Sequence, residues 1–355
     1  GISVKVKEYE MIYKDAENIQ VNLDNKFVIA DLDKVNYSLF NKIKKNRIYN
    51  MINPTTIMKS IKNDVEVVNE AKAHIKDGVA YIRFLYWFEK NKKNGITELD
   101  IANHLLSERE KMEGFIEESF EPIVAYGRHG AIVHYSPNKT SDIVIENKSF
   151  VLIDTGAHYY EGTTDITRTL TCGELTEEER KNYTLVLKGN LALGDAKFIY
   201  GTTGANLDIL ARNNLWKAGL DYNHGTGHGV GYLLNVHEGP NNIRWRLGSG
   251  KNLSCTIEPG MITSNEPGLY IDKKYGIRLE NMIVCKEKEK NVFGRFLEFE
   301  TLTMVPFDIR AIKKELLNDE EIKLLNQYHK KIYKILHSFL NEQEEKFLYE
   351  ITREI

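Results

Sequence analysis

The sequence predicts an α+β protein, in which helices surround a mostly antiparallel sheet and a helical tail follows. Three observations lead to this prediction. Apolar residues recur every three or four positions over Ile61–Tyr86, which is the spacing expected on one face of a helix. Strand-like apolar runs occupy about residues 123–170 and 232–305. From residue 311 onward the chain is rich in Lys and Glu and shows a helical stripe of apolar residues.

The remaining elements follow in chain order. Residues 1–55 alternate short apolar runs with polar breaks, which is typical of a small α/β piece. Thr97 with Asp100, and Thr176 with Glu179, stand where capping boxes open helices. Further helices are therefore predicted over about residues 98–105, 177–196 and 206–218.

Composition excludes several classes of protein. The 355 residues carry 48 Lys and Arg against 51 Asp and Glu, so we expect neither nucleic acid nor an anionic membrane as partner. The longest stretch without a charged residue, Tyr222–His237, is rich in His and Gly, which argues against a membrane span. Cys172, Cys255 and Cys285 form no C-x-x-C pair. We therefore expect buried free thiols and a reducing, cytoplasmic location.

Four acidic residues lie within apolar strand patterns. If the strands that hold Asp154 and Asp165 form one hairpin, symmetric pairing about a midpoint just before Tyr160 sets the two carboxylates opposite each other. The same arithmetic for the later hairpin sets Glu266 opposite Glu280. Like charges in this arrangement are destabilising unless a cation lies between them. Either the four acids face solvent separately or, as their apolar surroundings favour, they converge on a polyvalent cation.

The segment His224-Gly225-Thr226-Gly227-His228 supplies nitrogen donors. A zinc-binding H-E-x-x-H helix is disfavoured, because the glycines oppose a helix and no Glu follows His224. A phosphate-binding loop is disfavoured because no Lys-Ser/Thr pair follows. Alternating glycines instead let the backbone approach a site closely while the imidazoles project into it.

Together these segments resemble a known family. The ordered set Asp154, Asp165, His228, Glu266 and Glu280 stands in the segments LIDTGAHYYEGTTDITRT, HGTGHGVG, NEPGLY and GIRLEN. This set is similar to that of the pita-bread metallopeptidases, and within them to the longer, eukaryotic-type Xaa-Pro aminopeptidase (aminopeptidase P) branch. The segments GAIVHY, VHEGP and FLEFETLTMVP agree as well. The resemblance implies the pita-bread fold from about Pro54 to the C-terminus.

The resemblance also implies a dinuclear site. Asp154 would bind one metal ion, His228 and Glu266 the second, and Asp165 and Glu280 would bridge the two. Glu266 would also act as the general base on a metal-bridging water. Carboxylates with a single imidazole suit Mn²⁺, with Co²⁺ or Zn²⁺ as substitutes.

Four further residues receive roles from the same resemblance. His134 and His237 match residues that assist the tetrahedral intermediate and proton transfer. His224 matches a residue that lines the pocket for the proline ring. Arg278 lies on the strand face of Glu280, where it either orients the ligands or contacts the substrate.

The expected function is removal of the N-terminal residue from peptides that have proline at the second position. The alternatives are an Xaa-Pro dipeptidase on the same fold and a pita-bread module that binds peptides without catalysis. The resemblance divides the chain into three parts. Residues 1–55 would be a remnant of the second N-terminal domain of an N-terminally truncated chain. Residues 56–308 would form the catalytic domain, and residues 309–355 a helical extension. It is compatible with a homodimer. His129 stands where a small or polar residue is expected.

Overall fold

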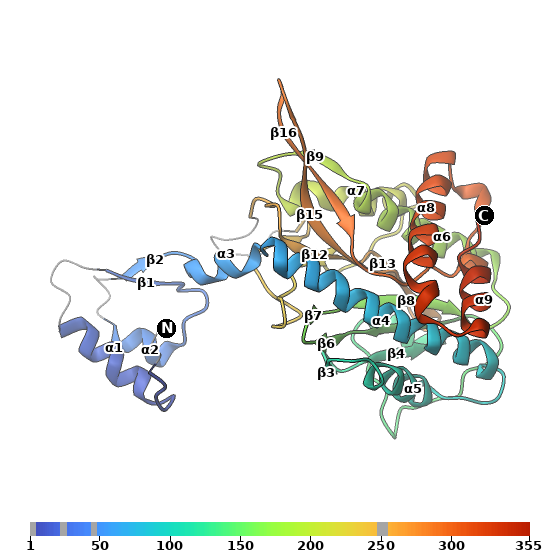
Figure 1. Cartoon of the computed structure of the whole chain (residues 1–355), viewed down its shortest axis with the longest axis horizontal. Coiled ribbons are helices and arrows are strands. Elements are labelled where there is room, and N and C mark those ends of the chain that lie inside the picture. The colour runs from blue at the N-terminus through green and yellow to red at the C-terminus, as the bar shows by residue number, and fades with distance from the viewer. Residues whose placement is uncertain (1–4, 22–26, 44–47, 247–254) are drawn as a thin grey trace. The chain divides into compact units, whose positions relative to one another are not determined.

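The computed structural model describes residues 5–21, 27–43, 48–246 and 255–355. These residues divide into two compact units (Figure 1). Described residues up to Lys59 form the smaller unit, and those from Ser60 onward form the larger one. None of the described helices is both long and apolar enough to cross a membrane.

The smaller unit is an α/β piece. Its strands β1 (Val28–Ala30) and β2 (Ile48–Asn50) pair in parallel, and α2 (Tyr37–Lys42) lies between them in the chain, as parallel pairing requires a crossover. Asn36 caps α2 by accepting a hydrogen bond from the Leu39 N–H. Helix α1 (Met11–Val21) contacts α2, and α3 (Pro54–Ser60) follows β2.

The larger unit is built from helices around antiparallel ladders. Its helices are α4 (Asp64–Asn91), α5 (Glu98–Glu110), α6 (Glu177–Gly194), α7 (Gly204–Lys217), α8 (Asp319–Leu336) and α9 (Glu342–Ile351). Its strands are β3 (Phe115–Glu118), β4 (Ile123–Tyr126), β5 (Phe150–Thr155), β6 (Ala157–Tyr159), β7 (Gly162–Thr163), β8 (Ile166–Thr171), β9 (Lys197–Ile199), β10 (Gly227–His228), β11 (Asn242–Ile243), β12 (Ile262–Asn265), β13 (Gly268–Ile271), β14 (Tyr275–Arg278), β15 (Asn281–Asn291) and β16 (Gly294–Thr301). Every ladder among these strands is antiparallel, so the predicted α+β class is confirmed.

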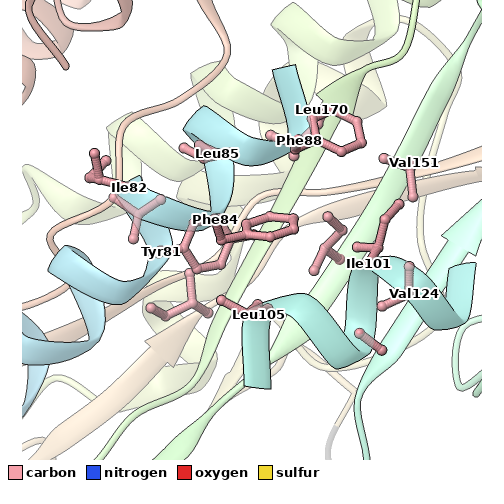
Figure 2. Close-up of a cluster of buried hydrophobic side chains, with 14 of the residues drawn as sticks. Tyr81, Ile82, Phe84, Leu85, Phe88, Ile101, Leu105, Val124, Val151 and Leu170 are labelled. Carbon is pink, nitrogen blue, oxygen red and sulfur yellow. The ribbon is translucent and has the colours of Figure 1, made fainter. Parts of the chain in front are cut away.

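Helix α4 is the long amphipathic helix that the apolar spacing predicts. It begins at a capping box formed by Asn63 and Glu66. Its apolar face, including Tyr81, Phe84 and Phe88, packs with side chains of α5, β4, β5 and β8 in the largest hydrophobic cluster (Figure 2). The predicted capping boxes of α5 and α6 are also present. The starts of α5 and α6 were therefore readable from the sequence.

The predicted helical tail consists of α8 and α9. Helix α8 buries Leu325, Ile332 and Leu336 and contacts both α4 and α6. The tail is therefore packed into the same unit as the antiparallel ladders. All three cysteines are free, as expected, and Cys172 and Cys285 are buried, whereas Cys255 is only partly buried.

Candidate active site

A cavity of about 760 Å³ opens in the larger unit. All nine side chains that the sequence singled out line it: His134, Asp154, Asp165, His224, His228, His237, Glu266, Arg278 and Glu280. Its walls also include apolar Phe120, Val133 and Trp245 and the cationic Arg244 and Arg246, which the sequence did not single out. Cavities of several hundred Å³ are the size that holds small ligands.

The first carboxylate pair comes from β5 and the start of β8. The predicted pairing of Asp154 with Asp165 is wrong by two residues, because Asp154 lies opposite Thr167. Tyr159 pairs with Gly162, so the chain turns at the two residues between them, one position later than expected. A two-residue shift keeps side chains on the same face of a sheet. Asp165 therefore remains on the face of Asp154, as a diagonal neighbour.

The second carboxylate pair flanks the β13–β14 hairpin, and here the predicted register is confirmed. Gly268 pairs with Arg278, and continuing this register brings Glu266 opposite Glu280. Glu280 is also fastened to β8. The Thr167 hydroxyl donates to Glu280 Oε2 at 2.6 Å, and the Glu280 N–H donates to the Thr167 carbonyl at 3.0 Å.

His228 reaches the carboxylates because its backbone lies directly against β12. A Cβ atom on Gly227 would lie 1.9 Å from the carbonyl oxygen of Ser264, so only glycine permits this approach. The His228 N–H donates to Ser264 Oγ at 2.9 Å, and the ring Nδ1 lies 3.1 Å from the Gly229 carbonyl. This contact places a proton on Nδ1, and Nε2 faces the acids.

Asp165, His228, Glu266 and Glu280 form one tight cluster, and Asp154 lines the same cavity. Asp165, His228 and Glu280 offer ligand atoms within 4.8 Å of one another. His228 Nε2 lies 3.4 Å from Asp165 Oδ2 and 3.6 Å from Glu266 Oε1. Asp154 Oδ1 and Glu280 Oε1 are buried without a hydrogen-bond partner among the described residues. Buried acceptors that lack a donor are costly, and a cation between the carboxylates would satisfy them.

The pKa shifts of the clustered groups also favour a bound cation. Burial raises the pKa values of Asp154 and Glu280, and it raises the pKa of Glu266 to about 7. The charges of the neighbouring carboxylates raise all three pKa values further. Burial alone would lower the pKa of His228, but its hydrogen bond with Asp165 and the charge of Glu266 raise it to about 9. Burial and mutual repulsion therefore disfavour four ionised carboxylates here unless further positive charge is present. Oxygen-rich ligands with one imidazole fit hard divalent ions.

Arg278 connects the cluster to the adjoining wall of the cavity. Its Nη2 donates to Asp154 Oδ2 at 2.6 Å and its Nη1 to the Tyr270 hydroxyl at 2.7 Å. The Tyr270 hydroxyl also lies 2.9 Å from His224 Nε2. Burial lowers the pKa of His224 to about 3, and the charge of Arg278 contributes, so the ring is neutral. Sequence reasoning missed Tyr270, although its period-two spacing from Glu266 could have revealed it.

His134 and His237 are exposed side chains that line the same cavity. The His237 ring centroid lies 4.3 Å from that of His228. Partial desolvation by the surrounding cavity wall, followed by the charge of His228, lowers the pKa of His237. These imidazoles lie within reach of a ligand in the cavity but outside the carboxylate cluster.

The segment that carries His134 is anchored by a buried glutamate, which explains His129. His129 Nδ1 lies 2.9 Å from Glu98 Oε1. Glu98 also accepts hydrogen bonds from the Tyr126 N–H and the Tyr135 hydroxyl, each at 2.7 Å. One carboxylate in the first turn of α5 therefore holds the chain on both sides of His134.

Family models match most of the chain. Residues 59–287 match metallopeptidase family M24, residues 295–355 match the C-terminal region of that peptidase, and residues 1–66 match the creatinase/prolidase N-terminal domain. The chain is similar to the probable Xaa-Pro aminopeptidase P of Aspergillus flavus (40% identical, covering 97% of this chain and 54% of that protein). The same-named Fusarium vanettenii protein is 42% identical, covering 93% of this chain and 55% of that protein. The chain thus spans about half the length of the curated relatives it matches.

Solved structures show the same relationship. The X-prolyl aminopeptidase from Caenorhabditis elegans, described as a cytosolic enzyme with a di-nuclear active site, matches with a TM-score of 0.91 at 35% identity, over 98% of this chain and 57% of that one. The Xaa-Pro dipeptidase from Bacillus anthracis matches with a TM-score of 0.67 at 27% identity, over 84% and 78%. The predicted pita-bread fold is thereby confirmed. Because a family model covers residues 59–287 of the 355, the chain belongs to metallopeptidase family M24.

Proposed function

We propose that this chain is a metal-dependent aminopeptidase that hydrolyses the N-terminal Xaa-Pro bond of peptides. The observation that carries the proposal is that Asp154, Asp165, His228, Glu266 and Glu280 line one cavity of about 760 Å³, in which Asp165, His228 and Glu280 offer ligand atoms within 4.8 Å of one another. The names of the similar fungal and nematode proteins support the choice of substrate.

The five clustered side chains are the proposed ligands of two divalent ions. Their unpartnered oxygen atoms and mutual repulsion support a cationic occupant, and the donor set favours Mn²⁺, with Co²⁺ or Zn²⁺ as alternatives. When bound, such ions polarise the scissile carbonyl and lower the pKa of a water molecule. The C. elegans enzyme, described as having a di-nuclear active site, supports a count of two.

The other proposed roles belong to the chain itself. Glu266 accepts the proton of the attacking water. The bond before proline is a tertiary amide whose nitrogen carries no hydrogen, so its cleavage needs a proton delivered to that nitrogen. His237 and His134, on the cavity wall, supply that proton and hydrogen-bond the developing oxyanion. His224 packs beside the proline ring, and Arg278 fixes the orientation of Asp154.

The domain assignment is part of the same proposal. We assign catalysis to residues 56–308, a helical extension to 309–355, and an N-terminal domain of the creatinase/prolidase type to 1–55. The three family-model matches, over residues 59–287, 295–355 and 1–66, support this division. A cytoplasmic location is supported by the free cysteines and by the cytosolic description of the C. elegans enzyme. A homodimer stays a prediction.

The test is cleavage by the purified, Mn²⁺-loaded chain of three peptides: an Xaa-Pro-Xaa tripeptide, an Xaa-Pro dipeptide and an Xaa-Ala-Xaa tripeptide. We expect chromatography to show release of the first residue from the Xaa-Pro tripeptide alone. Turnover of the dipeptide alone would indicate a dipeptidase, and peptide binding without turnover would indicate a binding module. Asp165→Asn keeps the size of the side chain and removes its charge, so it should abolish both metal binding and hydrolysis. Activity retained in that variant would refute the proposal.

A further inference from the structure

The guanidinium of Arg168, three residues after Asp165, is fully buried on β8. Its Nη1 donates to the carbonyls of Thr167 (2.9 Å) and Glu280 (2.5 Å). Its Nη2 donates to Asn281 Oδ1 (2.7 Å) and to the Val305 carbonyl (2.6 Å). Among the described residues, its hydrogen-bond acceptors are carbonyl, amide and hydroxyl oxygens, so it works as a multi-point connector rather than as half of an ion pair.

Arg168 completes a three-point attachment of Glu280 to β8. The Glu280 N–H donates to the Thr167 carbonyl, the Thr167 hydroxyl donates to the Glu280 carboxylate, and Arg168 Nη1 donates to the Glu280 carbonyl. Both the main chain and the side chain of Glu280 are therefore fixed relative to the strand that follows Asp165.

On its other side Arg168 meets helix α8. Arg168 Nη2 lies 3.1 Å from the Tyr328 hydroxyl, which in turn donates to the Val305 carbonyl at 2.8 Å. The hydroxyl also lies 3.2 Å from Asn281 Oδ1, next to Glu280 in the chain. Burial raises the pKa of Tyr328, so the hydroxyl keeps its proton as a donor. The guanidinium carbon lies 4.3 Å from the centroid of the Phe307 ring, within cation–π range.

The position of Tyr328 is fixed by the packing of α8. Leu325, one turn before it, and Ile332, one turn after it, are fully buried, and the helix contacts α4 and α6. A displacement of α8 would therefore move the Tyr328 hydroxyl and, through Arg168, the Glu280 main chain. This path joins the helical tail to the carboxylate cluster.

We propose that Arg168 and Tyr328 are positioning residues through which helix α8 holds Glu280 and Asp165 at the spacing that their divalent ions require. This inference rests on the proposed function, because it takes the cluster to be a metal site. Residues that orient the ligands of a metal commonly change metal affinity about 10–100-fold when they are mutated. Tyr328 acts one step further away, through Arg168 and Asn281, so its effect should be smaller.

The test is a titration of the metal-free chain with Mn²⁺, in which electron paramagnetic resonance measures the free ion. Tyr328→Phe removes only the hydroxyl, and we expect it to weaken Mn²⁺ binding by about 3–10-fold. Arg168→Lys keeps the charge and loses the planar fork, and we expect a loss of about 10–100-fold. The matched control is Tyr183→Phe. Tyr183 is buried, and its hydroxyl accepts from the Asp308 N–H at 3.0 Å, so this variant should lose stability without losing Mn²⁺ affinity.

The outcomes separate the two proposals. Wild-type Mn²⁺ affinity in Tyr328→Phe would overturn the positioning role and leave the proposed function standing. Equal loss of affinity in Tyr328→Phe and Tyr183→Phe would also overturn it, because that result indicates general destabilisation. A wild-type chain that binds Mn²⁺ but does not cleave Xaa-Pro peptides would refute the proposed function alone. A wild-type chain that binds no Mn²⁺ would overturn both. If Arg168→Lys fails to fold, Tyr328→Phe still decides.

Discussion

Gly227 is the position where a single added carbon atom should disable the site. A Cβ there would lie 1.9 Å from the Ser264 carbonyl oxygen and 2.9 Å from its carbon, whereas real Cβ contacts are essentially never closer than 3.0 Å. The two backbones would have to separate by at least 1.1 Å, the difference between 3.0 and 1.9 Å. Neither partner is a flexible side chain, so the strain cannot be relieved locally.

This separation would move two ligands at once. His228 follows Gly227 directly, and Glu266 lies two residues after Ser264. Metal–ligand distances tolerate about 0.2 Å, and a misplacement of about 1 Å can reduce catalysis about 100-fold. For Gly227→Ala we therefore expect loss of tight Mn²⁺ binding and a fall of at least about 100-fold in kcat/KM for an Xaa-Pro tripeptide.

Gly194→Ala is the matched control, because a Cβ at Gly194 would lie 3.6 Å from Asn265 Nδ2, an ordinary contact. Gly194 ends helix α6, and alanine is the better helix former by up to about 1 kcal/mol, so this variant should keep full activity. Both variants are assayed at a temperature well below their own Tm, by Mn²⁺ titration and by peptide cleavage. Wild-type affinity and activity in Gly227→Ala would refute the close-approach argument. Equal damage in Gly194→Ala would show that the assay reports a general loss of structure.

Three further predictions concern metal, positioning and pH. Removing divalent ions with a chelator should lower the Tm, and Mn²⁺ at about 100 times its Kd should restore about 2.7 kcal/mol of stability; a Tm indifferent to Mn²⁺ would contradict the metal site. Glu98→Gln should loosen the segment around His134 and lower kcat roughly 10-fold with unchanged Mn²⁺ affinity, and an unaltered kcat would argue against this anchoring role. Burial, aided by the charge of Arg168, lowers the pKa of His329 to about 3. The unfolded state therefore binds more protons below about pH 6.5, and stability is lost as the pH falls from there towards 3. Urea unfolding at several pH values should show that His329→Gln loses less stability than the wild type between pH 6.5 and about 3. Equal losses in the two proteins would contradict the assignment of this pH dependence to His329.

Helices and ligand identities were predictable because their signals are local. The capping boxes at Thr97 and Thr176 lie within four residues of sequence, and the spacing of apolar residues marks α4 directly. The carboxylates stood out because each interrupts an apolar strand pattern, where an unpaired charge is costly. The register of the β13–β14 hairpin also followed from its own sequence, since a single short loop joins the strands.

The β5–β8 register failed for a physical reason. Its prediction required the position of a turn inside Gly156–Thr164, and the residues there permit turns one position apart. The pairing of Tyr159 with Gly162 decides between them. The error changed which residue lies opposite Asp154, but it did not change the face, because each step of the turn moves the partner by two residues.

The contacts that support the site were beyond sequence reasoning. Glu98 and His129 are 31 residues apart, and Arg168 and Tyr328 are 160 residues apart. No periodicity or local motif connects such positions, since each contact arises from the packing of separate elements. His129 therefore appeared as an unexplained departure until its partner in α5 was known.

The charge of the cluster explains why a fold would keep four acids together. Asp154, Asp165, Glu266 and Glu280 contribute −4 when ionised. Of the described side chains that contact them, Arg278 and His228 are cationic, so the cluster by itself sums to −2. If two divalent cations were bound and His228 were a neutral ligand, the four carboxylates, Arg278 and the two ions would together carry a net charge of +1. A site of that charge would favour the negative charge that develops on a scissile carbonyl oxygen. In the proposed metal site, bound cations would offset the repulsion among the four carboxylates, and the charge of Arg278 would leave the net charge positive rather than zero.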